Sequence, residues 1–237
     1  MSARRTVLYT VLAVMGAPLA GTAQLTIVTA RDAEDNVTAV ELISLRAKAD
    51  IQADLEKATR ALAGAEADIL LCRSELQRCQ ADVDIQRSRI DITKTELKLA
   101  RSQRREADRE SLEQRKRVQD AERELLEKVE DAVRARLKYS EEVLEWAQAA
   151  VTAHQLELEL VEKNEELTAF AERGSGEQVP DWLGEGLDDL RGRVLTAMRT
   201  AAEKEMRVAR ERRSYVGAQL QVLDAQRKLT ERLVNPA

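Results

Sequence analysis

Apolar residues recur every seven positions from Ile51 to Tyr139, without an insertion or a deletion. In heptad notation, one row (position a) holds mostly large residues, and the neighbouring row (position d) holds mostly small ones. Position a holds Leu55, Leu62, Ile69, Leu76, Val83, Ile90, Leu97, Arg104, Ser111, Val118, Leu125, Ala132 and Tyr139. Position d holds Ile51, Ala58, Ala65, Cys72, Cys79, Gln86, Thr93, Ala100, Ala107, Gln114, Ala121, Lys128 and Ala135. This pattern predicts a coiled-coil helix whose seam packs on another helix.

We expect this helix to span residues 38–173. Thr38 and Glu41 have the spacing of a capping box at a helix start, and between Thr38 and Arg173 there is no proline and one glycine, Gly64. Residues 174–180 contain two glycines and end in Pro180, which predicts a loop. A returning helix with its own apolar seam then spans 181–234. The predicted fold class is all-α: a long antiparallel coiled-coil helical hairpin with an extended N-terminal coiled-coil arm.

The weakest part of the long helix is the stretch from Arg101 to Arg117. Its seam carries Arg104, Ser111 and Gln114 in place of apolar residues. A hinge or a hairpin in this stretch is the alternative to one continuous helix, and it would give three shorter helices. Its basic side chains could also bind an acidic partner, although a charged stretch of helix is usually a solvated face.

The register of the hairpin follows from the position of its loop. With the turn centred near Glu177, the numbers of facing residues add up to about 354, twice 177. The predicted hairpin contacts are Tyr139 with Tyr215, Trp146 with Val208, and Leu160 with Val194. Glutamates of the first helix then run along arginines and lysines of the second, and these pairs favour the register more than they stabilise it.

The returning helix is too short to cover the whole seam of the outgoing helix. Its roughly 54 residues reach back to about Gln119 and leave Ile51 to Leu97 uncovered. A row of large apolar residues does not stay exposed to water, so we expect an oligomer interface there, with a second copy or with another helical envelope protein. The predicted interface residues are Leu55, Leu62, Ile69, Leu76, Val83, Ile90 and Leu97.

The two cysteines, Cys72 and Cys79, lie at successive d positions of this seam. On one helix their Cα atoms are about 10.5 Å apart, too far for a disulfide within the chain. Two readings remain open. They could form interchain disulfides in a parallel, in-register oligomer outside the cytoplasm, or they could be small core residues in positions that alanine fills elsewhere.

The N-terminus has the pattern of an export signal. Arg4 and Arg5 precede about fifteen mostly apolar residues, and small residues follow before Gln24. We expect a signal peptide at 1–23, with an uncleaved anchor as the alternative, and a periplasmic or secreted mature chain with no membrane span. Residues 24–37 are expected to form an extended segment, either a loose tail or a strand added to a partner's sheet.

Neither the composition nor the charge of the chain indicates an active site. Charged residues make up 34% of the chain and aromatic residues 3%, with a net charge of −5, which suits a helical rod and gives no general attraction to nucleic acid. The only histidine is His154, and with Glu157 it makes a weak pair of metal ligands. We expect no enzyme activity, no catalytic residues, no cofactor and no metal.

These features predict an exported, non-enzymatic coiled-coil protein that acts as an oligomeric scaffold or adaptor of the cell envelope. Two alternatives stay open. One is a periplasmic chaperone that holds unfolded proteins, and the other is a coiled-coil regulator of an envelope hydrolase or of an export machine. None of the residues favours a particular partner.

Overall fold

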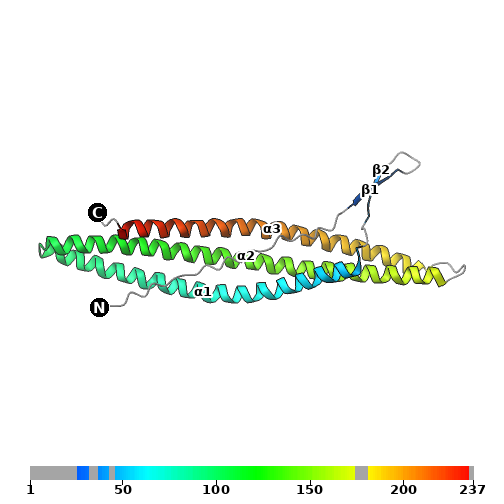
Figure 1. Ribbon diagram of the computed structural model, residues 1–237, viewed down its shortest axis with the longest axis horizontal. Coiled ribbons are helices and arrows are strands. Elements are labelled where there is room, and N and C mark those ends of the chain that lie inside the picture. The colour runs from blue at the N-terminus through cyan, green and yellow to red at the C-terminus, as the bar shows by residue number, and fades with distance from the viewer. Residues whose placement is uncertain (1–25, 32–36, 43–45, 174–180, 235–237) are drawn as a thin grey trace. The chain divides into compact units, whose positions relative to one another are not determined.

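The computed structural model describes residues 26–31, 37–42, 46–173 and 181–234 (Figure 1). Its elements are β1 (Thr26–Arg31), β2 (Val37–Leu42), α1 (Lys48–Ser102), α2 (Glu106–Arg173) and α3 (Asp181–Val234). The chain divides into two compact units, Met1–Ser44 and Leu45–Ala237, which are described separately. The predicted signal peptide at 1–23 and the predicted loop at 174–180 lie outside the described residues. The all-α helical-hairpin fold class is confirmed, and no described helix is long and apolar enough to cross a bilayer.

In the first unit, β1 and β2 pair as antiparallel strands, with Thr26 opposite Leu42 and Arg31 opposite Val37. The prediction that a helix begins at Thr38 is therefore wrong, because Thr38 and Glu41 lie in β2. Both strands are rich in β-branched residues, which favour extended backbone. A capping box is a local signal, and here strand pairing overrides it. The helix instead begins at Lys48.

The expected helix 38–173 is also divided at Arg104. α1 ends at Ser102 and α2 begins at Glu106. Arg104 has a φ of 54°, the left-handed conformation. The Arg105 N–H donates to the Ala100 carbonyl at 3.1 Å, and the Arg104 N–H donates to the Arg101 carbonyl at 3.3 Å. This pair of bonds around a left-handed residue is the Schellman helix end, so the chain turns back here as an antiparallel helix pair.

Because of this turn, the N-terminal arm does not extend away from the hairpin but packs on α2. All the d residues from Ile51 to Ala100 are buried, and the opposing surface belongs to α2. Gln86 fixes the register, since its Nε2 donates to the Gln119 carbonyl at 3.1 Å and to Glu122 at 2.9 Å. The small d residues allow the two backbones to approach closely.

α2 and α3 form the second antiparallel pair, and α3 spans the same residues as the predicted returning helix. Leu160, Leu190 and Val194 are buried between them. α2 lies between α1 and α3 (Figure 1), and no Cα atom of α1 comes within 8 Å of a Cα atom of α3 in the described part of the chain. The helical unit is therefore two helix pairs that share α2.

Candidate functional site

The predicted oligomer interface lies inside the helical unit. Ile69, Val83, Ile90 and Leu97 are buried, and Leu55, Leu62 and Leu76 are half-buried. α2 covers this row, so the conclusion that another chain must cover it is wrong. The prediction failed because it assumed a continuous helix through Arg104. Whether the chain associates through another surface is a separate question.

The two cysteines face α2 from the same seam. Both are free thiols and both are buried. Burial raises the pKa of the Cys72 thiol to about 11, and the nearby Asp68 carboxylate adds to the shift. Burial likewise raises the pKa of Cys79. An interchain disulfide at these positions would need thiols that face a second chain, so the structure favours the small-core-residue reading.

The residues predicted to pack the hairpin lie along the α2–α3 contact. The rings of Tyr139 and Tyr215 stack, with centroids 6.2 Å apart and planes 12° apart. Leu160 and Val194 are buried, and Trp146 and Val208 are half-buried. Lys204 pairs with Glu145 across the same contact.

A polar cluster links α1 to α2 beside the tyrosine stack. Arg136 forms ion pairs with Asp68 and, at 3.4 Å, with Glu75. The Ser140 hydroxyl donates to Asp68 at 2.5 Å. Tyr215 of α3 stacks on Tyr139, which precedes Ser140 in α2, so its ring lies beside this cluster. Burial raises the pKa of Tyr215, and the charge of Arg136 works against this rise. The cluster places residues 68–72 of α1 and Tyr215 of α3 at the same level of the unit.

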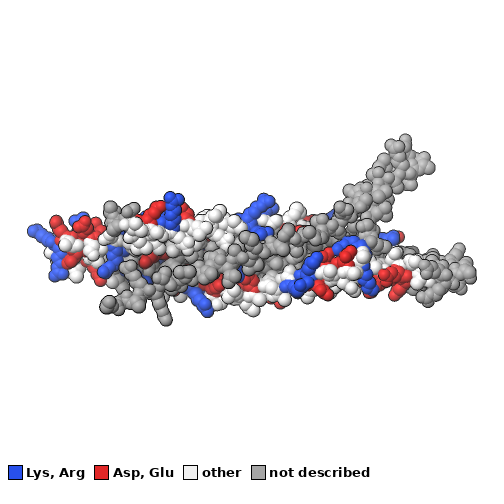
Figure 2. Space-filling view, in the orientation of Figure 1, with Lys and Arg blue, Asp and Glu red and all other residues white. Residues whose placement is uncertain are grey.

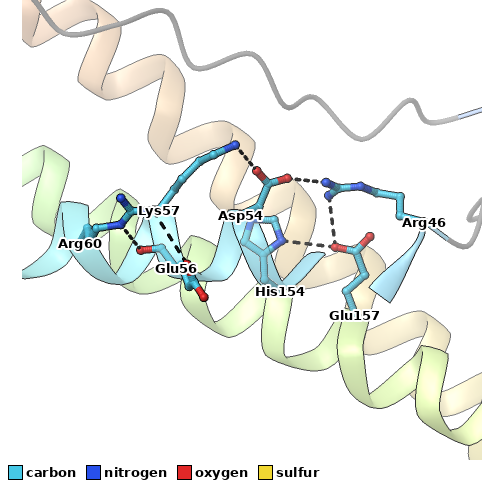
Figure 3. Close-up of polar contacts among 7 residues, drawn as sticks. All are labelled: Arg46, Asp54, Glu56, Lys57, Arg60, His154 and Glu157. Carbon is cyan, nitrogen blue, oxygen red and sulfur yellow. Dashed lines mark hydrogen bonds and ion pairs between the residues drawn. The ribbon is translucent and has the colours of Figure 1, made fainter. Parts of the chain in front are cut away.

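A second polar cluster joins the start of α1 to α2 (Figure 3). Glu157 is only 2% exposed, and its Oε2 lies 3.5 Å from Arg46 Nη1 and 3.3 Å from His154 Nδ1. Arg46 also pairs with Asp54, which accepts a hydrogen bond from Lys57 at 2.8 Å. Burial works to raise the pKa of Asp54, but the bonds from Lys57 and Arg46 outweigh it and hold that pKa low.

This second cluster is a structural one. The guanidinium of Arg46 occupies the place next to Glu157 that a metal cation would need, and like charges repel there. Across the described ranges, no three His, Cys, Asp or Glu side chains converge to hold a metal. A cavity of about 280 Å³ at the α1–α2 turn is lined by charges of both signs, among them Arg105, Asp108 and Arg115.

The back of α2 is polar and faces solvent. The exposed residues of its middle fall in two adjacent rows: Asp131, Lys138, Glu145 and Thr152, and Arg134, Glu141, Gln148 and Gln155. Ion pairs attach the neighbouring helices at this back, Arg73–Glu141 at 3.8 Å from α1 and Lys138–Glu211 at 2.9 Å from α3. On the face that Figure 2 shows, charges of both signs are interspersed along the helices. The opposite side of α2 faces the neighbouring helices, and Ser140, Ala147 and Ala150 are buried there.

α1 carries an exposed apolar row on its outer surface. This outer row of α1 consists of Leu71, Ile85, Ile92 and Leu99, which are 48–60% exposed. Leu71 and Ile85 each precede by two residues an arginine, Arg73 or Arg87, that pairs with α2 at the back. Two residues rotate a helix position by about 200°, so the outer row points away from the back.

α3 carries a matching exposed surface. This outer face of α3 consists of Met206, Val216, Leu220, Leu223 and Val234. Leu220 follows Glu211, which pairs with Lys138 at the back, by nine residues, a rotation of about 180°. Leu220 therefore points away from α2. Exposed apolar residues thus lie on the outer surfaces of both α1 and α3, and such surfaces are typical of protein-binding sites.

Sequence reasoning missed these outer residues, although a signal was present. Leu71, Ile85, Ile92 and Leu99 repeat every seven residues, like the seam itself, with only Arg78 interrupting. The sequence analysis expected the seam of α1 to lack a partner in the same chain, so the second apolar row could not be recognised as a separate surface.

Comparisons with known proteins found no matching family model, no similar curated protein and no similar solved structure.

Proposed function

We propose that this chain is an exported, non-enzymatic scaffold or adaptor of the cell envelope that binds helical partners through the exposed apolar surfaces of α1 and α3. The observation that carries the proposal is the pair of exposed apolar surfaces, the outer row of α1 and the outer face of α3. Each large apolar side chain covered there contributes roughly 1.5–3 kcal/mol. The N-terminal export pattern supports the location.

The polar interior supports a scaffold more than a catalyst. The buried charged groups are used in ion pairs between helices, such as Arg136–Asp68 and Arg46–Glu157. Such pairs fix how the helices align, which is what a stiff spacer or adaptor requires.

Photo-crosslinking in cells tests the proposal. A photoreactive phenylalanine analogue is placed at Ile85, in the outer row of α1, or at Gln148, on the polar back, as the matched control. We expect adducts at Ile85 that are at least fivefold more abundant than at Gln148, in an envelope fraction. Equal labelling at both positions, or a chain that stays in the cytoplasm, would refute the proposal.

A holding chaperone is the second candidate, because an exposed apolar surface is also what binds unfolded chains. A light-scattering assay separates the two functions. Suppression of client aggregation that is lost in Leu223→Glu favours the chaperone, and the absence of suppression favours the scaffold.

A further inference from the structure

We infer that the outer face of α3 binds an acidic amphipathic helix of a partner protein, whose carboxylates pair with Arg213 and Arg227. This inference rests on the proposed function and names the chemistry of the partner. Three features of α3 support it: the spacing of its exposed apolar residues, the arginines that lie among them, and the length of the surface.

α3 has a second coiled-coil seam on its outer surface. Residues at alternating spacings of three and four run along the whole outer face, and this is the spacing of a helix that packs on another helix. We call these residues the outer seam of α3: Met206, Ala209, Arg213, Val216, Leu220, Leu223, Arg227, Thr230 and Val234. Its large apolar members are 45–70% exposed, so the described helices leave this seam uncovered.

The outer seam lies opposite the residues of α3 that pack on α2. Leu220 precedes Val222 by two positions, and Leu223 likewise precedes Ala225. Val222 and Ala225 are buried. Because two residues rotate a helix position by about 200°, the outer seam points away from α2. A partner helix can therefore pack along the outside of α3 while α3 stays on α2.

Two arginines lie in the outer seam, and they specify an acidic partner. Arg213 and Arg227 are two heptads apart and occupy the same row. A charged residue in a coiled-coil seam costs stability unless the facing helix supplies the opposite charge, and it then selects the partner. Arg210 and Arg212 lie beside Arg213 and are exposed as it is. Within the described ranges none of these three arginines forms an ion pair.

The charge around the outer seam favours the same partner. From Met206 to Val234, α3 has seven Lys or Arg residues and three Asp or Glu residues, whereas the whole chain has a net charge of −5. The outer face is therefore a basic segment of an acidic protein. Opposite charges across an interface speed association and disfavour partners of the wrong charge.

A second copy of the chain does not supply the required carboxylates. No residue of the outer seam is acidic, so in any alignment of two outer seams the arginines meet uncharged residues or each other. The outer row of α1 also lacks an acidic residue, and its one charged position is Arg78. Two copies would thus bring like charges together. The partner is therefore a different protein.

The length of the outer seam sets the expected affinity. Met206 to Val234 spans about 42 Å of helix. One helix contact about 10 Å wide then buries about 420 Å² on each side. This is about half of the roughly 800 Å² per partner that stable interfaces bury. We therefore expect a reversible contact with a dissociation constant on the order of 10 μM.

Two synthetic peptides test the inference on the full chain. Both have about four heptads with leucine in the seam. They differ only at two seam positions, two heptads apart, which are glutamate in one peptide and lysine in the other. Fluorescence anisotropy of the dilute, labelled peptide measures the dissociation constant. We expect the glutamate peptide to bind at least about tenfold more tightly than the lysine peptide.

Substitutions in α3 identify the groups that recognise the glutamates. Arg213→Glu combined with Arg227→Glu should reverse the preference, so that the lysine peptide binds more tightly. The matched control is Arg191→Glu combined with Arg193→Glu, which changes two exposed arginines of the same helix outside the outer seam and should keep the preference. Circular dichroism checks that the helicity of both variants is unchanged.

Four results would overturn the acidic helix as the partner. Equal binding of the two peptides indicates an unselective apolar surface, and binding of neither at about 100 μM indicates no helix-binding seam. A preference for glutamate that survives Arg213→Glu with Arg227→Glu places the acid-binding site elsewhere. A dimer in light scattering that Leu220→Glu dissociates places a second copy on the outer face. The proposed function is tested separately, because the adducts at Ile85 in cells report on α1.

Discussion

α1 carries two apolar rows that differ in what covers them. The inner row, which includes Ile90 and Cys72, is buried against α2, whereas the outer row, which includes Ile85 and Ile92, is exposed. Both rows repeat every seven residues. The comparison teaches that apolar periodicity identifies a contact surface but does not say whether the same molecule covers it. On α1 the answer depends on the turn at Arg104, more than fifty residues from Ile51.

The largest difference between the rows should appear on truncation to alanine. Ile90→Ala leaves a cavity in a packed seam and should lower the free energy of unfolding by about 2–4 kcal/mol. Ile92→Ala, two residues away and exposed, should cost under about 0.5 kcal/mol in the dilute monomer. Urea unfolding followed by circular dichroism measures both.

Protein concentration sharpens this comparison further. The cost of Ile90→Ala should be the same at every concentration, because its partner is in the same chain. The cost of Ile92→Ala should grow only where a partner chain covers the outer row. If the cost of Ile90→Ala depended on concentration, the inner row would be an interface between chains after all.

The returning helix could be read from the sequence because its limits are marked by strong local signals. Glycines precede Asp181 and prolines stand at 180 and 236. The register of the hairpin followed from the position of this loop, and Tyr139 does stack on Tyr215.

The turn between α1 and α2 could not be read in the same way. Residues 103–105 are Gln-Arg-Arg, with no glycine or proline, and Arg104 takes the left-handed conformation that glycine normally supplies. Only the weak seam between Arg101 and Arg117 pointed to it. The outer rows could be interpreted only after this turn was known, since the turn gives the inner row its partner.

The second prediction uses Cys72 to probe the inner row by pH. The folded pKa, about 11, lies above the unfolded value of 9.0. Folding therefore disfavours the thiolate. The free energy of unfolding should therefore be unaffected by this thiol below pH 9 and should fall as the pH rises toward 11. The expected loss is about 1–2 kcal/mol, after allowance for the solvent access of the thiol.

Cys72→Ala should remove this loss. The measurement is the free energy of unfolding of the parent and of Cys72→Ala, each at pH 8.5 and pH 10.5. These two pH values cover most of the range of about two units between the unfolded and folded pKa of the thiol. Tyr215 also titrates in this region, because burial raises its pKa, so the difference between the two proteins is the quantity to compare. An equal loss in both would mean that Cys72 is not enclosed by α2.

The smallest effect is expected at the turn itself. The φ of 54° at Arg104 brings its Cβ into a steric clash with the backbone. Glycine adopts this conformation without that clash. Arg104→Gly should therefore raise the free energy of unfolding by about 0.5–1 kcal/mol, after subtraction of the greater backbone freedom that glycine has when unfolded.

Arg105→Gly is the matched control, because among the described residues only Arg104 combines a positive φ with a side chain. This substitution should be neutral or destabilising. The difference in sign between neighbouring arginines distinguishes a turn at Arg104 from a continuous helix, in which both glycines would destabilise by similar amounts, about 1 kcal/mol each. If both did, α1 would extend past Arg104, its inner row would lose α2 as a partner, and the two apolar rows of α1 would again be equivalent.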